Sequence, residues 1–329
     1  MKRAVVTGGA GFIGSHMVDL LVDRGFDVRV IDNLATGRVE NLARHRSSSH
    51  VEIQRMDVCD LSPDSPFFRG VDYVFHFGGI GDIVPSIERP VEYMRANVHG
   101  TLAVLEAARH ASVGKVVYAA SSSCYGLATE VPTPESATIR PEYPYALSKY
   151  LGECVALHWA QVYGLPALSI RMFNVYGPRV RTTGAYGAVF GVFMTQKIHG
   201  RPFTVVGDGT QTRDFVYVTD VARAFLLAAE SPLTGEVFNV GSGNPQSVNR
   251  LVELLGGDVV HVPKRPGEPD CTFADIRKIQ RCLGWQPTVS FEEGVASMLE
   301  HIDDWRLAPL WTPEKIADAT RTWFEYLGR

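Results

Sequence analysis

The chain has 329 residues, of which 45% are hydrophobic and 21% are charged, and its formal net charge is −4. These fractions are typical of globular proteins, so extensive disorder, coiled coil and collagen are excluded. No block of five or more basic residues occurs, which argues against a nucleic-acid partner. No apolar run approaches the roughly 18 residues that cross a membrane, so no membrane association is expected. The length suits two lobes on one chain.

The cysteines and histidines follow no recognisable ligand pattern. Five scattered cysteines form no CxxC pair, which favours a reducing, cytoplasmic location over a disulfide framework. Ten histidines include no HExxH or similar spacing, so no metal site is expected.

Short β-branched runs alternate with longer amphipathic segments through the first half of the chain. Such alternation is typical of a parallel sheet covered by helices. Strands are predicted over residues 3–7, 28–32, 51–57, 71–77, 115–119 and 167–171, and helices over about 16–24, 91–110 and 145–163. The order of these elements predicts an α/β fold with a doubly wound, Rossmann-type parallel sheet.

After Gly177-Pro178 the alternation weakens and glycine and proline become frequent. A strand over 214–218 leading into a helix over 220–229, and a strand over 237–240, are expected to rejoin the first sheet. We therefore expect a Rossmann domain from residues 1–177 and 213–241. Residues 178–212 and 242–329, including tail helices from Phe291, would form a smaller, interleaved C-terminal substrate-binding lobe. The tail tryptophans Trp305, Trp311 and Trp323 are interpreted as core or lobe–lobe packing.

A glycine-rich turn directly follows the first predicted strand. Gly8, Gly11 and Gly14 fit the pattern GxxGxxG, with Phe12 and Ile13 opening the helix. Such a turn lets a pyrophosphate approach the backbone and the N-terminal amides of the helix. A glycine-rich turn without a ligand is the alternative.

The second predicted strand ends at Asp32, 18 residues after Gly14. A carboxylate there can accept hydrogen bonds from both ribose hydroxyls and would repel a 2′-phosphate, which favours NAD over NADP. Asp57 and Val58 end the third strand, where they could meet the adenine. A solvated strand-end Asp is an equally open interpretation of Asp57.

Tyr145 and Lys149 are one helical turn apart on the same face of a predicted helix. A phenol becomes a useful base only if its pKa falls, and a nearby ammonium together with the positive nicotinamide would lower it. An ordinary surface Tyr and Lys are the alternative. Ser121, where the fifth strand ends, would add a hydroxyl at the sheet edge that binds ligands. Cys124 is interpreted as a small wall residue, because no base lies near it in sequence.

Several further segments carry a family resemblance: Phe77-Gly78-Gly79, residues 97–101 (NVHGT), 171–179 (RMFNVYGPR), 207–215 (GDGTQTRDF) and 265–268 (RPGE). With the glycine turn and YxxxK, they make nearly the whole chain resemble the extended short-chain dehydrogenases/reductases of the NAD-dependent nucleotide-sugar epimerase/dehydratase group. The resemblance is greatest to UDP-glucose and UDP-N-acetylglucosamine 4-epimerases.

The resemblance implies roles for particular residues. Tyr145, assisted by Ser121, would take the proton of a sugar hydroxyl while Lys149 holds the nicotinamide ribose. Arg213 and Arg265 would bind phosphates and ribose, and Asn174 the diphosphate. The remaining cofactor contacts would come from Asn33, Phe77, Gly78, Gly79 and Asn97, and the remaining substrate contacts from Ser122, Ser123, Ser86 and Thr272. Family members pair as homodimers through helices matching 91–110 and 145–163.

The two residues after Ser121 indicate which of the family's reactions to expect. Dehydratases and decarboxylases of the family carry a carboxylate within two residues of the catalytic hydroxyl, whereas this chain has Ser122 and Ser123 there. Epimerisation at C4 of UDP-glucose/UDP-galactose or their N-acetylated forms is therefore favoured. The small Thr272 would leave room for an acetamido group; simple packing of its side chain is the alternative.

Two departures from the family pattern concern the donor. A glycine pair, Gly78-Gly79, replaces the usual alanines, and Asp82 lies where a longer polar side chain often reaches the substrate. The alternative functions are those of a decarboxylase, a dehydratase, an epimerase at another carbon and a non-catalytic NAD sensor.

Overall fold

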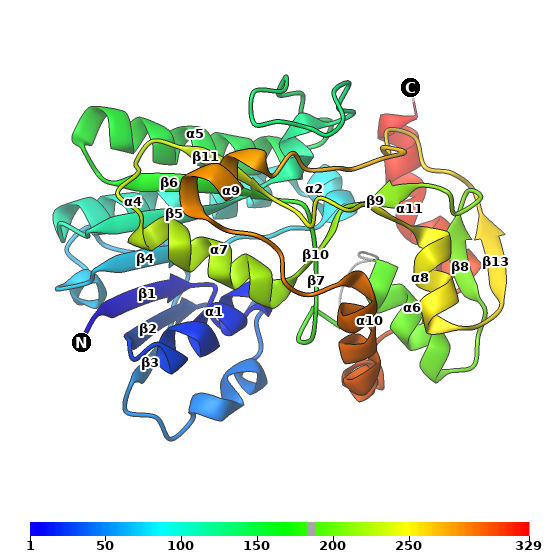
Figure 1. Ribbon diagram of the computed structural model, residues 1–329, viewed down its shortest axis with the longest axis horizontal. Coiled ribbons are helices and arrows are strands. Elements are labelled where there is room, and N and C mark those ends of the chain that lie inside the picture. The colour runs from blue at the N-terminus through cyan, green and yellow to red at the C-terminus, as the bar shows by residue number, and fades with distance from the viewer. Residues whose placement is uncertain (183–188, 329) are drawn as a thin grey trace.

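A seven-stranded parallel sheet forms the larger lobe of the computed structural model, which describes residues 1–182 and 189–328 (Figure 1). Its strand order is β11-β6-β5-β4-β1-β2-β3, and every neighbouring pair is parallel. The strands are β1 (Arg3–Thr7), β2 (Asp27–Asp32), β3 (Val51–Arg55), β4 (Tyr73–His76), β5 (Lys115–Ser121), β6 (Ala167–Met172) and β11 (Val237–Val240).

Helices bury both faces of this sheet. Along β1, Ala4 and Val6 pack in one apolar cluster with α1 (Phe12–Asp23), α7 (Val218–Glu230) and α9 (Arg277–Leu283). Val5 faces the opposite way, into a second cluster with α4 (Gly100–His110) and α5 (Pro144–Tyr163). This alternation with both sides apolar is what a central parallel strand requires. The predicted doubly wound Rossmann-type fold is confirmed.

The segment predicted as a helix over 91–110 is helical throughout, but its geometry changes along its length. It consists of α3 (Pro90–Met94), a π-helical turn over Arg95–His99, and α4. A π turn contains one extra residue and commonly marks a functional region. Asn97 lies in this turn and is 1% exposed.

The smaller lobe is built from later segments and from β7 (Asn174–Tyr176). Its helices are α6 (Val189–Ile198), α8 (Val248–Leu255), α10 (Phe291–Glu300) and α11 (Pro313–Leu327), and its other strands are β8 (Phe203–Val206), β9 (Thr212–Arg213), β10 (Phe215–Tyr217), β12 (Gln246–Ser247) and β13 (Val259–Val262). Phe190, Phe193, Phe203 and Trp305 are buried at its centre. The expected second-lobe residues 183–188 lie outside the described residues.

One predicted strand does not rejoin the main sheet. β10 pairs in parallel with β7, in a separate two-stranded sheet, whereas β11 joins β6 as expected. Because β5 and β11 already occupy both sides of β6, the strand over 215–217 has no free edge there. It pairs instead with β7, which comes after β6 and Phe173 in the chain.

No helix within the described residues combines the length and apolarity needed to span a membrane.

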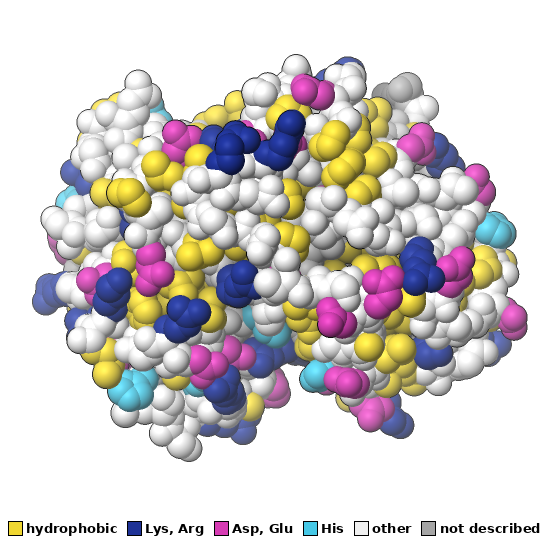
Figure 2. All heavy atoms as spheres, viewed as in Figure 1, with side chains coloured by type: hydrophobic (Ala, Val, Ile, Leu, Met, Phe, Trp, Pro, Cys, Tyr) yellow, Lys and Arg dark blue, Asp and Glu magenta, His cyan; other side chains and the backbone are white. Residues whose placement is uncertain are grey.

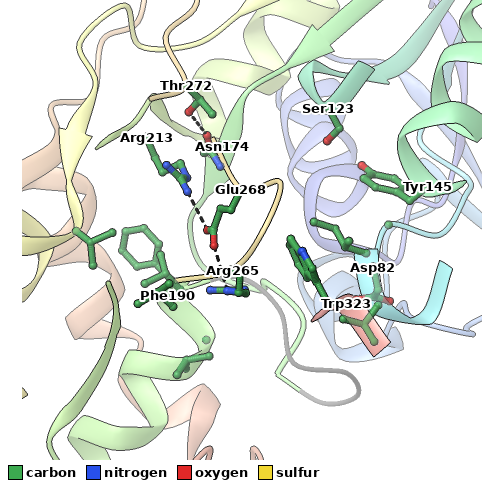
Figure 3. Close-up of a pocket in the computed structure, with 18 of the residues that line it drawn as sticks. Asp82, Ser123, Tyr145, Asn174, Phe190, Arg213, Arg265, Glu268, Thr272 and Trp323 are labelled. Atoms are coloured by element: carbon green, nitrogen blue, oxygen red, sulfur yellow. Dashed lines mark hydrogen bonds and ion pairs between the residues drawn. The ribbon is translucent and has the colours of Figure 1, made fainter. Parts of the chain in front are cut away.

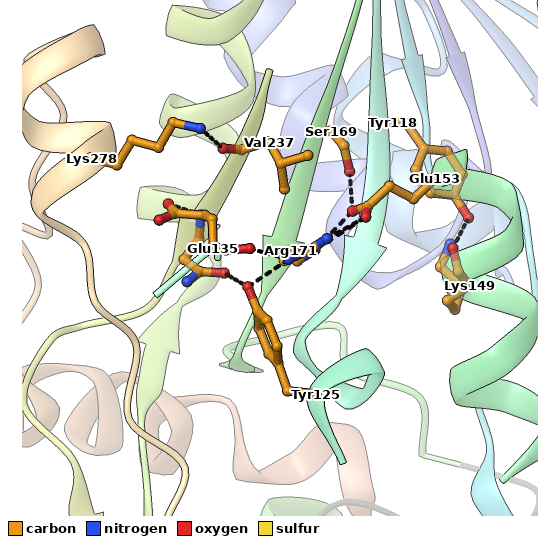
Figure 4. A network of polar contacts seen from close by, with 10 residues as sticks. Tyr118, Tyr125, Glu135, Lys149, Glu153, Ser169, Arg171, Val237 and Lys278 are labelled. Carbon is orange, nitrogen blue, oxygen red and sulfur yellow. Dashed lines mark hydrogen bonds and ion pairs between the residues drawn. The ribbon is translucent and has the colours of Figure 1, made fainter. Parts of the chain in front are cut away.

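A buried ion pair connects the sheet with α5 (Figure 4). Arg171 Nη2 lies 2.6 Å from Glu153 Oε1, and the two side chains are 6% and 2% exposed. The other carboxylate oxygen accepts a hydrogen bond from Ser169 Oγ at 2.7 Å. Arg171 also donates to the Tyr125 hydroxyl at 2.8 Å, and that hydroxyl donates to Asn239 Oδ1 at 2.7 Å. The network therefore joins α5, β6, β11 and the segment after β5.

Arg171→Met is expected to destabilise the fold by about 3–5 kcal/mol, because it leaves the Glu153 carboxylate buried without its partner. Urea unfolding followed by circular dichroism measures this change. The double variant Arg171→Met/Glu153→Leu should regain much of the loss. Arg250→Met, which removes an exposed ion-pairing arginine, is the control and should cost about 1 kcal/mol or less. Equal losses for Arg171→Met and Arg250→Met would contradict the assigned role.

Candidate active site

Two cavities meet at the carboxyl edge of the main sheet. The first, of about 390 Å³, lies over the β1–α1 turn and is lined by the larger lobe and the segment after β6. The second, of about 510 Å³, lies between the two lobes. Gly81, Tyr145, Val175 and Val180 line both cavities, so Tyr145 stands where they join.

The glycine turn lines the first cavity, as predicted. A Cβ on Gly14 would lie 2.1 Å from the carbonyl oxygen of Gly8, and Gly8 itself has a φ of +68°. Both positions therefore require glycine, which lets α1 start directly against the end of β1. The N-terminal amides of α1, from Phe12 and Ile13 onwards, thus begin at the cavity wall, in the arrangement that favours an anion.

Asp32 ends β2 at the same cavity and is 7% exposed. Its carboxylate accepts hydrogen bonds from the backbone N–H of Ala10 at 2.9 Å and of Leu34 at 2.8 Å. Burial raises the pKa of this carboxyl group, and the two backbone hydrogen bonds oppose that rise. The other predicted cofactor residues that line this cavity are Gly11, Asn33, Asp57, Val58, Phe77, Gly78, Gly79, Tyr145 and Lys149.

Asn97 is the exception among these predicted residues. It lies behind the cavity wall, where its side chain accepts from the backbone N–H of Ile80 at 2.8 Å and donates to the carbonyl of Ile80 at 2.9 Å. It also donates to Ser148 Oγ on α5 at 2.8 Å. A Cβ on Gly79 would lie 2.5 Å from Asn97 Oδ1, which accounts for glycine at that position. The contacts make Asn97 a positioning residue for residues 79–81.

The Tyr145 phenol lies beside Ser121. Burial raises its pKa, a hydrogen bond with Ser121 opposes this rise, and the negative charge of Asp82 adds to it. The lowered pKa expected from the sequence depends on the positive nicotinamide as well as on Lys149, so it stays a prediction for the enzyme with its cofactor bound. Ser121 is held by Ser123, whose backbone N–H donates to Ser121 Oγ at 3.2 Å while the two hydroxyls lie 3.0 Å apart.

Lys149 is buried one turn along α5 from Tyr145. Its ammonium lies 4.5 Å from the centre of the Tyr118 ring. Burial lowers the pKa of Lys149 to about 7, and the charge of Glu153 acts in the opposite direction. Cys124 is 2% exposed, and burial raises the pKa of its thiol to about 12, in agreement with its interpretation as a wall residue.

A charged cluster lies in the second cavity, opposite Tyr145 (Figure 3). Glu268 Oε1 accepts from Arg213 Nη2 at 2.8 Å, and Glu268 Oε2 lies 3.1 Å from Arg265 Nε. The Thr272 hydroxyl donates to Asn174 Oδ1 at 2.8 Å and accepts from the backbone N–H of Asp214 at 3.1 Å. The structure thus brings Arg213, Arg265, Asn174 and Thr272 together.

Ser122 and Ser123 also line the second cavity, but Ser86 does not. Ser86 is fully buried in α2 (Ile83–Glu88), and its hydroxyl donates to the carbonyl of Ile83 at 2.6 Å. The helix begins just after Asp82 and turns Ser86 inward, so its predicted substrate contact is wrong in this structure.

The wall residues that were not predicted as substrate contacts include four large or charged side chains near Tyr145 and the arginines: Asp82, Tyr143, Glu268 and Trp323. Asp82 is ion-paired with Arg181 at 2.8 Å, which accounts for a carboxylate at this position. Tyr143 precedes the YxxxK motif by two residues, so its position near the cavity could have been inferred from the sequence. Trp323 is separated from the motif by about half of the chain, and only folding brings it there.

Among the described residues, no group of three or more His, Cys, Asp or Glu side chains is arranged to hold a metal ion.

The fold and the grouping of Ser121, Tyr145 and Lys149 beside a Rossmann glycine turn define a dinucleotide-dependent enzyme of the short-chain dehydrogenase/reductase class. A model of the NAD-dependent epimerase/dehydratase family matches residues 4–241. The chain belongs to this family and is an NAD-dependent enzyme.

Known relatives align over almost the whole chain. A UDP-glucose 4-epimerase from Mycolicibacterium smegmatis is 36% identical over 91% of this chain and 97% of its own. The structure of a UDP-N-acetylglucosamine 4-epimerase from Methanobrevibacter ruminantium, in complex with UDP-N-acetylmuramic acid, is 33% identical with a TM-score of 0.87, covering 92% and 98% of the two chains. A UDP-glucuronic acid 4-epimerase from Bacillus cereus, with UDP-glucuronic acid and NAD, is 29% identical with a TM-score of 0.85, covering 92% and 99%. Decarboxylases and a 4,6-dehydratase are also among the relatives.

The first cavity suits NAD. The glycine turn has no side chains that would keep a pyrophosphate from the backbone, and Asp32, the predicted partner of the ribose hydroxyls, lines the same cavity.

Asp32→Asn is expected to weaken NAD binding about tenfold and to reduce the preference for NAD over NADP, because the charge that repels a 2′-phosphate is removed while the side-chain shape is kept. Titration calorimetry with each nucleotide measures both affinities. Asp57→Asn, in the wall of the same cavity, should weaken both nucleotides in the same proportion. If Asp32→Asn leaves the ratio of the two affinities unchanged, another group distinguishes the ribose.

Proposed function

We propose that this enzyme epimerises a UDP-hexose at C4, interconverting the glucose and galactose configurations of a plain or N-acetylated sugar. The observation that carries the proposal is the position of Tyr145, which stands between a dinucleotide cavity and a cavity whose far side holds two arginines. The 4-epimerase relatives support the same reaction.

The bound donor would extend from the arginines to Tyr145. Guanidinium groups suit diphosphate oxygens, and Arg213 and Arg265 are held close together by the Glu268 carboxylate between them. The amide of Asn174, whose oxygen is engaged by Thr272, offers N–H donors to the same diphosphate. Beyond the arginines the cavity wall becomes apolar, and Phe190, Val248 and Phe215 are available to pack against the nucleotide base of the donor.

Tyr145 is the proposed base. It would take the proton of the sugar 4-hydroxyl, and on the return step it would give that proton back to the C4 oxygen. NAD, when bound, supplies a nicotinamide that accepts the C4 hydride and returns it to the opposite face of the sugar. The hydrogen bond with Ser121 stabilises the phenolate as it forms. Lys149 would hold the ribose of the cofactor and keep a cation near the phenolate.

The carboxylates that line the second cavity are all engaged in ion pairs, which argues against dehydration and decarboxylation as the reaction. Both reactions need an acid or base beyond Tyr145, but the residues after Ser121 are serines. The carboxylates that do line this cavity are engaged in ion pairs: Asp82 with Arg181, Glu268 with Arg213, and Glu142 with Arg140 at 3.5 Å. Epimerisation needs only Tyr145, Ser121 and the cofactor.

N-acetylated donors are included in the proposal because of Thr272. Its side chain is small and lines the cavity, although its hydroxyl also holds Asn174 and Asp214.

We further expect a cytoplasmic homodimer. The exposed apolar side chains of α5 favour pairing through that helix: Leu147, Leu151, Val162 and Tyr163.

Proton NMR of the enzyme with NAD and single UDP-sugars tests the proposal. UDP-glucose, UDP-N-acetylglucosamine or both should give a new anomeric signal at constant mass without accumulation of NADH. Tyr145→Phe should retain NAD binding and lose about 100-fold or more in kcat, because the general base is removed.

Tyr150→Phe is the matched control, since Tyr150 lies on the same helix but lines neither of the two cavities. It should keep kcat within about twofold of the wild-type value. Loss of water or carbon dioxide from the substrate would replace epimerisation by dehydration or decarboxylation. Near-normal turnover by Tyr145→Phe would refute the assigned base.

A further inference from the structure

The C-terminal helix α11 reaches the substrate cavity through Trp323. This side chain is 5% exposed and lines the second cavity. Its indole N–H donates to the carbonyl of Pro266 at 2.7 Å, in the loop that carries Arg265. The neighbouring Thr322 donates to Glu88 Oε1 at 3.1 Å, at the end of α2. Helix α11 is therefore fixed to both lobes next to the cavity.

Trp323 also completes a row of aromatic rings that leads away from the catalytic phenol. The rings of Tyr145 and Tyr143 are stacked, with centres 6.3 Å apart and planes 11° apart. The ring of Tyr143 lies 6.4 Å from that of Trp323, and the Arg265 guanidinium lies 5.3 Å from the Trp323 ring. We call Tyr145, Tyr143 and Trp323 the aromatic row. It connects the proposed base with the proposed diphosphate clamp, and Figure 3 shows Trp323 between Tyr145 and Arg265.

We propose that Trp323 is a specificity-determining residue that forms one wall of the sugar subsite and limits the size of the substituents the sugar can carry. The inference rests on the proposed function, because the sugar of a bound donor must occupy the space between Tyr145 and the arginines. That space is bounded on one side by the aromatic row.

The chemistry of the wall suits a pyranose. Flat aromatic faces pack against the C–H groups of a sugar ring without restraining it by hydrogen bonds. Such a surface permits the sugar to turn over between the two hydride steps. The indole is held at its N–H by Pro266 and on its face by Arg265, so it has little freedom to move aside for a larger group.

Trp323→Ala tests this inference, with UDP-glucose and UDP-N-acetylglucosamine as probes. Removing the indole should raise kcat/KM for the N-acetylated donor relative to the plain donor by about tenfold, since added space favours the bulkier sugar. Trp323→Phe keeps an aromatic face of smaller size and should shift the ratio in the same direction by about threefold. Phe324→Ala is the control: its side chain lies on the same helix, is 40% exposed and should leave the ratio unchanged.

A merely structural role for Trp323 predicts equal losses with both donors, and an unchanged ratio in a folded Trp323→Ala or Trp323→Phe enzyme would overturn the inference. If Trp323→Ala does not fold, the ratio for Trp323→Phe decides alone. Failure of the proposed function is distinguishable, because the wild-type enzyme would then turn over neither donor.

Discussion

The buried ion pair between Arg171 and Glu153 is the interaction on which the geometry of the active site depends most. Glu153 lies one turn beyond Lys149 on α5, and Arg171 lies near the end of β6, just before the segment that supplies Asn174. Through Tyr125 the same guanidinium reaches the segment after Ser121. One charged pair thereby fixes helix, sheet and serine segment relative to one another. Well-packed apolar residues can often replace a buried pair of this kind without loss of stability, so we assign its importance here to the segments that it holds together.

Around this fixed centre the two lobes have different roles. The larger lobe holds the dinucleotide cavity, Tyr145 and Lys149, and the smaller lobe supplies Arg213, Arg265 and the apolar end of the second cavity. Ion pairs such as Asp82 with Arg181 join the two sides near the Tyr145 phenol. Burial and the charge of Asp82 raise the pKa of Tyr145, and the hydrogen bond with Ser121 acts in the opposite direction. The proposed role of Tyr145 as base therefore relies on Ser121 and on cations brought near the phenol.

Local patterns predicted the features that depend on local geometry. The glycine turn, Asp32 and YxxxK each follow from spacing within one element or across one strand–helix unit, and the structure places them at one sheet edge. The path of residues 215–217 could not be predicted, because it depends on both edges of β6 being occupied by β5 and β11. The π turn at Asn97 was missed for a similar reason, since its partners Ile80 and Ser148 lie on other segments. Long-range contacts also explain the error at Ser86, which α2 turns inward. Trp323 packs between the lobes as interpreted, and its additional place in the cavity wall depends on contacts with distant segments. Trp305, by contrast, is a core residue of the smaller lobe, as expected.

The proposed mechanism requires that a hydride leave C4 of the sugar and return to the same carbon. Incubating the enzyme and NAD with a UDP-hexose that carries deuterium at C4, followed by mass spectrometry and NMR of the product, tests this requirement directly. The mechanism predicts an epimer that retains the deuterium at C4. Deuterium lost to water, or found at C6 of a product that has lost water, would contradict it.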